Sequence, residues 1–337
     1  MPELSIIVPV YDVEAYLPEC LDSVLSQDFT DFEIVAVNDA SPDGSLDILR
    51  RYEKADPRLK VIDLPHNQGL GAARNAGIDA ATGRYVVFLD SDDSIVPGAL
   101  SAMWGRARQT GADVVLFGWT REYEDGTILQ GTGRWILARA PERFTARNYP
   151  RILHVLQIAC NKLIRRDFLD RIGLRFVDGC YEDTVFTYPL LVSASSLTAL
   201  AEPLLRYRQR EKAITRTRGP QHLQLLDQWD RAMRQVYALA KDEPAVRSYL
   251  FAQMLYHCLT VLLKHERIPE SSHRAFVRDL RQLYRTYLPK GGYQPVRRIN
   301  KVHHILLQTG SPALMRAGWR LTTFARDQVR RVIPRRD

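Results

Sequence analysis

The sequence predicts an α/β protein with a mainly parallel sheet flanked by helices, followed by a smaller all-α region. Apolar runs of strand length alternate with amphipathic helical patterns over residues 4–119. Polar or acidic loops follow several of these runs, as at the ligand-binding edge of a parallel sheet. Beyond residue 219 long amphipathic patterns replace the strand-like runs. We therefore predict one domain over 1–218 and a helical, basic region over 219–337.

The predicted strands and helices of the first half follow one another along the chain. Each strand is a short run of branched or aromatic residues, and each helix has apolar residues three to four positions apart. This alternation is typical of βαβ units. The strands are expected at 4–10, 32–37, 59–64, 85–89 and 113–119, and the helices at 13–27, 45–54, 69–81 and 97–109.

The pattern weakens beyond residue 120. The turn sequences EDGT and GTGR indicate a hairpin between 121 and 136. The segments IACNKLIRRDFLDRIGLRF and GCYEDTVFTYPLLVSA have helical periodicity, and an extended stretch is expected at about 197–207. Amphipathic helices such as 249–264 are expected throughout 221–288.

The composition is that of a globular protein. Of 337 residues 45% are hydrophobic and 26% are charged, and this length fits about two structural units. The four cysteines have no metal-binding spacing, which argues against structural zinc and fits a reducing compartment. The sequence has neither a basic leader nor ~18 consecutive apolar residues. We expect a cytoplasmic protein that contacts a membrane, if at all, peripherally at its inner face.

The net charge of +8 indicates an anionic partner, although an ordinary surface excess explains it equally well. Anionic lipid and a phosphate-rich polymer are both compatible with this positive charge. A nucleic acid is not expected, because aromatic residues are not interleaved with the basic ones. The basic cluster at 326–336 is either a frayed end or a contact for an anionic membrane.

The run YVVFLDSDD places three carboxylates directly after a predicted buried strand. On an extended backbone Asp90 and Asp92 project to the same side, whereas Ser91 and Asp93 point elsewhere. Two converging carboxylates favour a hard divalent cation such as Mg²⁺ or Mn²⁺, shared with substrate phosphates. The alternative is a polar turn that caps the next helix.

The sequence HNQGLGAARNAG predicts a second part of the same site. Gly69 and Gly71 permit close approach of the backbone to a ligand where a helix begins, and free N–H groups there favour phosphate. Arg74 lies one turn further along and can neutralise a diphosphate. Alternatively, Arg74 and Asn75 pair with strand-end carboxylates and hold this edge together.

Five motifs with the same order and spacing over about residues 4–216 resemble the family 2 glycosyltransferases, which have the GT-A fold. They are SIIVPVYDVEAYLPECLDSVLSQDFTDFEIVAVNDASPDGS, HNQGLGAARNAG, FLDSDD, NKLIRRDFL and YEDTVF. The resemblance implies a UDP-sugar donor, a divalent Mn²⁺ or Mg²⁺ ion and inversion at the anomeric carbon. It implies a hexosyl- or N-acetylhexosaminyl-transferase.

The family resemblance also assigns donor-binding residues. Asp39 is implied to accept a hydrogen bond from N3 of uracil, or else it is only a turn residue. Tyr11 follows Pro9 and can present its ring to the base, and Glu14 is either part of this site or a carboxylate in the first helical turn. The implied donor-binding set is Pro9, Tyr11, Glu14, Asp39, Asn67, Gly71, Arg74, Asp90, Ser91, Arg208 and Arg210, with Asp92 and Asp90 as metal ligands.

The acceptor side is assigned by the sequence YEDTVF. Asp183, supported by Glu182, resembles the family's general base, which takes a proton from the acceptor hydroxyl. The alternative is that this pair caps the helix beginning near Thr184. Arg208 and Arg210 resemble a loop that contacts the diphosphate, and Lys162 is interpreted as part of an internal ion pair.

The predicted function is metal-assisted transfer from a UDP-sugar to a hydroxyl of a cell-surface polymer, teichoic-acid-like or capsular. The chain is similar to the N-terminal transferase domain of bacterial proteins that also carry a CDP-glycerol glycerophosphotransferase domain. It is thus either a stand-alone relative or a part of a larger enzyme. The alternative function is a non-catalytic nucleotide-sugar-binding module of a polymer-synthesis complex. The sugar, the acceptor, the linkage and the oligomeric state, including a homo-oligomer, stay open.

Overall fold

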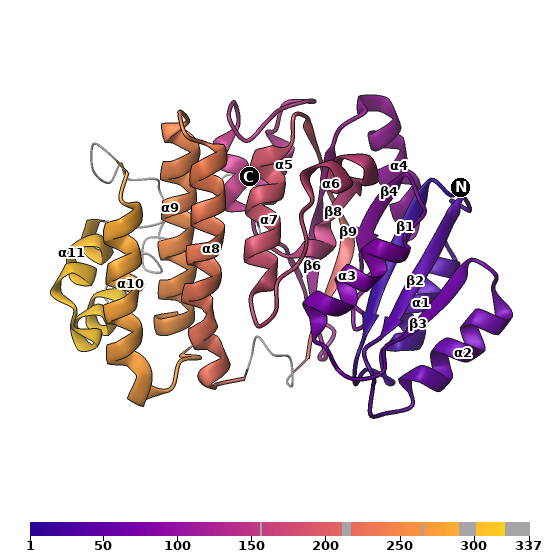
Figure 1. Cartoon of the computed structure of the whole chain (residues 1–337), viewed down its shortest axis with the longest axis horizontal. Coiled ribbons are helices and arrows are strands. Elements are labelled where there is room, and N and C mark those ends of the chain that lie inside the picture. The colour runs from indigo at the N-terminus through magenta and orange to yellow at the C-terminus, as the bar shows by residue number, and fades with distance from the viewer. Residues whose placement is uncertain (156, 211–216, 265, 290–300, 321–337) are drawn as a thin grey trace.

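A mixed nine-stranded sheet lies at the centre of the described chain (Figure 1). This computed structural model describes residues 1–155, 157–210, 217–264, 266–289 and 301–320. The strands run in the order β3-β2-β1-β4-β8-β6-β9-β5, and β7 pairs with β6. Their bounds are β1 Leu4–Val10, β2 Phe32–Asn38, β3 Leu59–Asp63, β4 Tyr85–Phe88, β5 Ser94–Ile95, β6 Val114–Tyr123, β7 Ile128–Gln130, β8 Lys162–Arg165 and β9 Leu197–Gln209.

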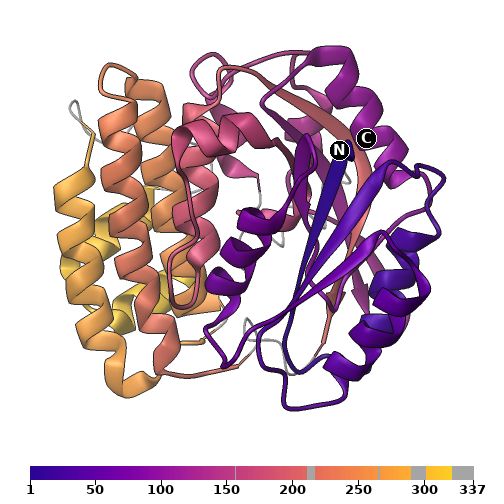
Figure 2. The same ribbon diagram turned by 45° about the vertical axis from the view of Figure 1, so that its right-hand side comes forward.

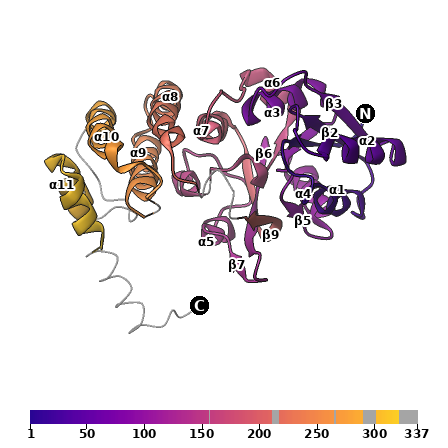
Figure 3. The ribbon, with the colours of Figure 1, turned by 90° about the horizontal axis from the view of Figure 1, so that it is seen from below.

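The first four strands form the predicted parallel unit. Ile7 of β1 lies between Val35 of β2 and Phe88 of β4, and β3 adds parallel to β2. Every residue of β1 and β2 is buried, because helices cover both faces of the sheet. Figures 2 and 3 show α3 on one face and α1 and α2 on the other. The helices of this half are α1 Leu17–Leu25, α2 Ser45–Ala55, α3 Leu70–Ala80 and α4 Ala99–Thr110.

Two of these helices begin later than predicted. Asp12 has a φ of 53° and Gly98 has a φ of 77°, and neither is compatible with the helix that follows. The helix α1 starts at Leu17, after a turn over residues 14–16, and has Pro18 in its first turn. Glu14 precedes α1, so the interpretation of Glu14 as a first-turn helical carboxylate is wrong.

The strand β8 corrects the prediction of a helix through NKLIRR. Ile164 pairs antiparallel with Val86 of β4 on one side and with Val114 of β6 on the other. Because Leu163 and Ile164 are both fully buried in the sheet, the run lacks the alternation that marks a half-exposed strand. The helical pattern applies only from residue 166, where α6 Arg166–Ile172 begins.

The predicted hairpin is present, but it is shorter than expected. Thr120 to Glu122 of β6 pair with Ile128 to Gln130 of β7. The second half of the predicted segment forms the short helix α5 Arg134–Ala138 instead. On its other edge β6 runs parallel to β9, which ends at the carboxyl edge of the sheet.

Helices dominate the chain beyond β9, as predicted. They are α8 Gln224–Leu239, α9 Pro244–Leu259, α10 His273–Tyr287 and α11 Lys301–Thr309. The helix α7, Glu182–Ser193, joins them to the sheet, since Tyr188 stacks on Trp229 of α8 at 5.0 Å between ring centroids. In the described ranges no helix is long and apolar enough to span a bilayer. The domain boundary near 219 stays a prediction.

Candidate active site

The polar loops after β2 and β4 reach the same edge of the sheet as the loop before α3. Asp39, directly after β2, accepts hydrogen bonds from the backbone N–H groups of Gln68 (2.7 Å) and Gly69 (2.8 Å). Gly69 has a φ of 89°, which favours glycine, and α3 starts at the next residue. The buried Asp39 carboxylate therefore fixes the start of α3. Its contact with uracil stays a prediction.

Arg74 of α3 connects three carboxylates from two other elements. Its Nη1 donates to Glu182 Oε1 and to Asp183 Oδ1, each at 2.7 Å, and its Nη2 donates to Asp90 Oδ1 at 2.8 Å. Arg74 is 1% exposed, and its guanidinium lies over the ring of Phe176, 5.1 Å from the centroid. The alternative that Arg74 pairs with a strand-end carboxylate is confirmed for Asp90, whereas Asn75 exchanges hydrogen bonds with the backbone of Phe176 and not with a carboxylate.

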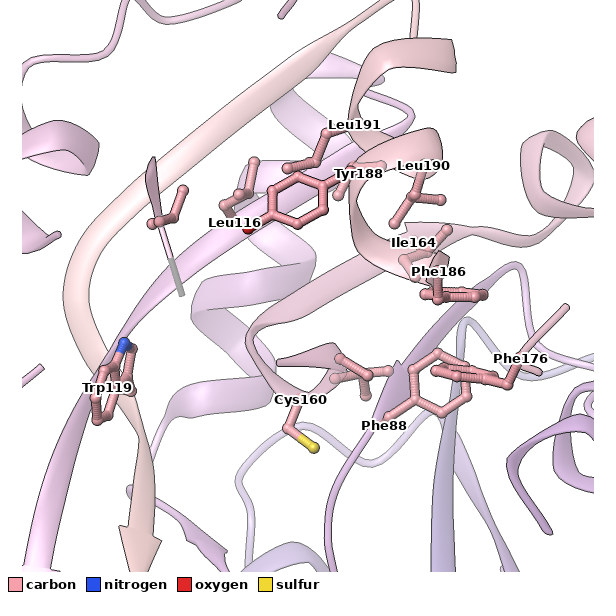
Figure 4. Close-up of a cluster of buried hydrophobic side chains, with 14 of the residues drawn as sticks. Phe88, Leu116, Trp119, Cys160, Ile164, Phe176, Phe186, Tyr188, Leu190 and Leu191 are labelled. Atoms are coloured by element: carbon pink, nitrogen blue, oxygen red, sulfur yellow. The ribbon is translucent and has the colours of Figure 1, made fainter. Parts of the chain in front are cut away.

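A stacked aromatic layer supports this guanidinium. The rings of Phe176 and Phe186 are parallel within 7° with centroids 4.0 Å apart, and Phe88 meets Phe176 edge to face. Figure 4 shows these three rings together, beside Cys160. Because Phe88 belongs to β4 and Phe186 to α7, the layer also fixes the distance between Asp90 and Asp183. Arg74 and its acids are therefore held by packing as well as by charge.

The acids around Arg74 outnumber it. Burial and the neighbouring Asp183 raise the pKa of Glu182 to about 7, with Arg74 opposing them. Burial likewise raises the pKa of Asp183, again against Arg74. Burial opposes the charge of Arg74, but Asp183, Asp90 and Glu182 hold its pKa well above the usual value. Glu182 and Asp183 titrate as a pair, and a carboxylate of raised pKa suits a general base.

The acids Glu182 and Asp183 form the start of α7. Tyr181 immediately before them has a φ of 67°, a strained conformation for a residue other than glycine. Its hydroxyl is 2.7 Å from Nδ1 of His222, which anchors the ring. No side-chain capping hydrogen bond is made at the start of α7, because both carboxylates turn to Arg74. The pair thus makes no capping hydrogen bond, although both carboxylates lie in the first turn of α7, where negative charge is favourable.

On the donor side Asp92 pairs with Arg210. The distance from Arg210 Nε to Asp92 Oδ2 is 2.6 Å, and the guanidinium lies over the ring of Tyr16 at 5.5 Å. Arg208 also lies over Tyr16, and it forms an ion pair with Glu19 at 2.6 Å. Both arginines come from the end of β9. They form, with Tyr16 and Glu19 from the start of α1, a cationic cluster beside the carboxylates after β4.

The carboxylates after β4 fit a divalent cation only together with another ligand source. Among the described residues no group of three or more His, Cys, Asp or Glu side chains could hold a metal ion. Asp90 and Asp92 supply two carboxylates, and substrate phosphates commonly complete such a set. Asp90 already uses Oδ1 for Arg74, and Asp92 uses Oδ2 for Arg210. A cation can bind the second oxygen of each carboxylate, share an oxygen with an arginine, or displace the arginine.

The backbone at this point is a turn, which corrects one premise of the sequence analysis. The N–H of Asp93 donates to the carbonyl of Asp90 at 2.9 Å, so the strand-like alternation of side chains does not continue past Leu89. Asp93 is buried and accepts a hydrogen bond from the N–H of Arg208. Burial and the nearby Asp92 raise its pKa. Asp93 thus fixes the end of β9 next to Asp92.

Comparison with known proteins identifies the family. A model described as "Glycosyl transferase family 2" matches residues 5–173. The uncharacterized glycosyltransferase EpsJ of Bacillus subtilis (strain 168) is 30% identical over 331 residues, which cover 96% of this chain and 94% of EpsJ. The chain belongs to the family 2 glycosyltransferases. It is therefore an enzyme that transfers a sugar, as its sequence predicted.

A solved structure confirms the predicted GT-A fold of this glycosyltransferase. The crystal structure of S. aureus TarS 1-349 in complex with UDP-GlcNAc is similar over 97% of this chain and 92% of that one, with a TM-score of 0.72 and 22% identity. A shorter match is the poly(ribitol-phosphate) beta-glucosyltransferase of Bacillus spizizenii (strain ATCC 23059 / NRRL B-14472 / W23). It is 41% identical over 117 residues, 34% of this chain and 18% of that protein.

The other predicted donor-binding residues of the glycosyltransferase lie along this edge, with different degrees of exposure. Tyr11 directly follows β1 and is 46% exposed, which leaves its ring accessible to a base. Glu14 accepts a hydrogen bond from the N–H of Gly44 at 2.6 Å, so it joins the loops after β1 and β2. Pro9 and Ser91 are buried, and Asn67 is exposed in the loop before α3.

Gly71 and Lys162 have structural explanations in the transferase. A Cβ added at Gly71 would lie 2.5 Å from the carbonyl oxygen of Val177, so the missing side chain lets α3 approach that segment. Lys162 is buried, and its Nζ donates to the carbonyl of Ile158 and to Oδ1 of Asn161. Burial lowers its pKa to about 8, with Asp183 opposing the shift. Its hydrogen bonds thus end on neutral oxygens, where an ion pair was predicted.

Sequence reasoning missed Tyr16, Glu19 and Phe176. Tyr16 and Glu19 are three positions apart at the start of α1, and no chemical pattern distinguishes them from residues of an ordinary amphipathic helix. Phe176 lies in a segment without regular structure before α7. Only the fold reveals their roles, because each acts on an arginine distant in sequence.

Proposed function

We propose that this glycosyltransferase moves a hexosyl or N-acetylhexosaminyl group from a UDP-sugar to a hydroxyl of a cell-surface polymer, with inversion. The observation that carries this proposal is the position of Arg74 between Asp90 and Asp183. One guanidinium contacts both carboxylates within 2.8 Å, so the donor-side and acceptor-side acids lie on two edges of a single planar group. With the two acids on either side of Arg74, one can face an attacking hydroxyl and the other a departing diphosphate at the same anomeric carbon.

On the acceptor side Asp183 serves as the general base. The acceptor hydroxyl gives its proton to the Asp183 carboxylate while its oxygen attacks the anomeric carbon, and the bond from that carbon to the UDP oxygen breaks. Glu182 and Arg74 orient Asp183 and set its charge. A single displacement of this kind inverts the anomeric centre.

On the donor side Asp39 and Tyr11 bind the uracil, and Arg208 and Arg210 approach the diphosphate. A Mn²⁺ or Mg²⁺ ion held by Asp92 and Asp90 would supply Lewis-acid stabilisation of the leaving diphosphate. The guanidinium groups add charge-assisted hydrogen bonds to phosphate oxygens. Their position over Tyr16 keeps them at the end of β9 before the donor arrives.

Two relatives support the choice of substrates. TarS 1-349 was solved with UDP-GlcNAc, and one relative is named a poly(ribitol-phosphate) beta-glucosyltransferase. The net charge of +8 is compatible with a polymer that carries phosphate. We therefore infer a UDP-hexose or UDP-N-acetylhexosamine donor and a teichoic-acid-like or capsular acceptor.

The proposal is tested by measuring UDP release from a panel of UDP-sugars with Mn²⁺, with and without polyol-phosphate polymer. We expect one donor to give polymer-dependent release and a product whose anomeric configuration, read by NMR, is opposite to that of the donor. A retained configuration would exclude Asp183 as the base of a single displacement. Donor binding without any release would favour the non-catalytic binding module.

A further inference from the structure

Residues 176–181 lead into α7, which begins with Glu182 and Asp183. They contain no helix or strand, and we refer to them as the pre-α7 segment. Its first residue is fixed by α3, because the backbone of Phe176 exchanges two hydrogen bonds of 2.9 Å with the side chain of Asn75. Its later residues contact the start of the helical region, in which α8 packs beside α7 (Figure 1). The position of the two acids therefore depends on what holds this segment.

Two glutamines of α8 hold the backbone of the pre-α7 segment. The N–H of Cys180 donates to Oε1 of Gln224 at 2.7 Å. The Nε2 atom of Gln228 donates to the carbonyl of Asp178 at 2.9 Å. Between these two bonds Gly179 has a φ of 95°, and a Cβ there would lie 2.6 Å from Gln224 Oε1. The missing side chain at this position therefore lets α8 approach the segment closely.

His222, in the short 3₁₀ helix η3 Pro220–Leu223, holds the side chain of Tyr181. Its Nε2 is 2.8 Å from the carbonyl oxygen of Thr217, which can only accept, so Nε2 carries the proton of the neutral ring. Nδ1 is then an acceptor, and the Tyr181 hydroxyl donates to it at 2.7 Å. Burial lowers the pKa of His222, against the Thr217 carbonyl, which keeps the ring neutral at neutral pH. Burial raises the pKa of Tyr181 to about 12, against Arg267, so the hydroxyl keeps its proton.

Tyr181 has a backbone conformation that requires support from its surroundings. Its φ of 67° lies in the left-handed region, which is unfavourable for a bulky aromatic residue. Such a conformation persists where the surrounding contacts determine it. A change of φ at Tyr181 would turn the first residues of α7, and Asp183, with its 2.7 Å contact to Arg74, is only two positions further along. The hydrogen bond between Tyr181 and His222 therefore affects where the Asp183 carboxylate lies.

We propose that His222, through the Tyr181 hydroxyl, positions Asp183 for its reaction, while Gln224 holds the adjacent backbone. The start of the helical region is thus a positioning element of the active site, whereas the basic cluster at 326–336 lies outside the described residues. That the positioned carboxylate is a base rests on the proposed function. The hydrogen bonds that hold it do not depend on that function.

The first test is hydrogen exchange of the full chain without any ligand. Peptides that cover 176–184 should exchange at least about tenfold faster in Tyr181→Phe and in His222→Leu than in wild type. Tyr181→Phe removes a single hydroxyl, so it keeps the test valid if replacement of the buried His222 prevents folding. The matched control Gln221→Ala removes a hydrogen bond to Thr217 from the residue next to His222, and it should exchange as wild type does.

Transfer kinetics distinguish positioning from a general structural role. In UDP release from the panel of UDP-sugars with polymer, Tyr181→Phe should lower kcat about tenfold, because a displaced base slows the reaction. The KM for the donor and the calorimetric affinity for UDP should stay as in wild type, because the donor side is unchanged. Gln224→Ala, at an exposed residue, should lower kcat in the same way.

A conservative replacement of His222 gives a second kinetic readout. His222→Asn places an amide oxygen near the position of Nδ1, so it should recover most of the kcat that His222→Leu loses. Thermal unfolding should rank the two variants in the opposite order, because a buried site tolerates leucine better than an incompletely bonded amide. The double variant Tyr181→Phe/His222→Leu should be no slower than His222→Leu, since both changes remove the same hydrogen bond.

Two results would overturn the proposal. The first is hydrogen exchange over 176–184 that equals that of wild type in both Tyr181→Phe and His222→Leu. The second is wild-type kcat in these variants while Asp183→Asn is inactive. An active Asp183→Asn would instead contradict the proposed function, and hydrogen exchange would still decide whether His222 holds the pre-α7 segment.

Discussion

Arg210 and Asp92 form an ion pair of 2.6 Å at the position where a divalent cation is proposed to bind. The Arg210 guanidinium also makes a cation–π contact with the ring of Tyr16. Burial raises the pKa of Asp92, and Arg210 opposes that shift. Arg210 thus provides the charge that the cation would otherwise provide, and the two compete for the same carboxylate.

The variant Arg210→Gln should therefore bind Mn²⁺ more tightly in the absence of donor. A partly exposed ion pair is worth up to ~1 kcal/mol, so the expected gain is about fivefold. UDP should bind more weakly, because a phosphate contact is lost. Electron paramagnetic resonance of free Mn²⁺ measures the first effect and calorimetry with UDP the second.

A neighbouring arginine provides the control for Arg210. Arg206 pairs with Glu122 at 3.4 Å, away from the carboxylates after β4, and Arg206→Gln should leave Mn²⁺ binding unchanged. Equal Mn²⁺ affinity of wild type and Arg210→Gln would show that Arg210 and the cation do not compete. Full transferase activity in EDTA would remove the metal from the mechanism.

Replacement of Arg74 should be far more damaging than replacement of a surface arginine. Arg74→Gln leaves three acids near one another without their shared cation, and breaking a buried pair in this way costs ~3–5 kcal/mol in the free energy of unfolding. Arg74→Lys keeps the charge but loses the fork that contacts three carboxylates, so it should restore part of the stability. Urea unfolding measures both variants.

The Arg74→Gln variant should also show a distinctive pH dependence. Burial already raises the pKa values of Glu182 and Asp183 in the wild type, and loss of the opposing guanidinium should raise them further, so that the folded variant binds more protons than the folded wild type and its stability depends more steeply on pH. Its stability should therefore rise as the pH falls through the range where these acids titrate. Arg175→Gln, which removes an exposed pair with Asp79, should change stability by less than ~0.5 kcal/mol at any pH. A flat pH dependence for Arg74→Gln would contradict the shared-cation description.

The acid side of the pH–rate profile should reflect Glu182 and Asp183. The base must be ionised, so kcat/KM should fall as the pH drops through the raised pKa of the pair. Glu182→Gln removes one negative charge beside Asp183 and should move this decline to lower pH. Asp183→Asn should bind UDP normally but lose at least ~10²-fold in turnover. An unmoved profile in Glu182→Gln would show that the two acids are not coupled.

Sequence reasoning located the residues of this site better than it located their contacts. The loops after β2 and β4 were expected at one edge, because parallel strands place their carboxyl ends together, and Asp39 and Asp90 lie there. The Arg210–Asp92 pair was not foreseen. It depends on the register of β9 on β6, which shifts at Gly118, and a register between distant strands leaves no mark in the local pattern. β8 was missed for a similar reason, since a four-residue strand buried on both faces has no periodicity of its own.

A final prediction concerns stability away from the active site. Glu33 of β2 is 4% exposed, and it accepts hydrogen bonds from Ser5 at 2.7 Å, from the N–H of Thr82 at 2.6 Å and from Lys60 at 2.8 Å. Burial alone would raise its pKa, but these donors together lower it to about 2. The charged carboxylate thus joins β2 to β1, to β3 and to the loop before β4.

Because the pKa of Glu33 is lowered in the folded state, its contribution is complete above the ordinary value of about 4.3 and is lost as the pH falls toward 2. Glu33→Gln should lower the free energy of unfolding by ~1–3 kcal/mol at pH 7, since buried donors lose their charged acceptor. The gap between wild type and variant should narrow between about pH 4.3 and pH 3, measured by urea unfolding. Glu124→Gln, at an exposed glutamate, should show neither effect. A gap that stays constant down to pH 3 would mean that the carboxylate charge contributes nothing to these contacts.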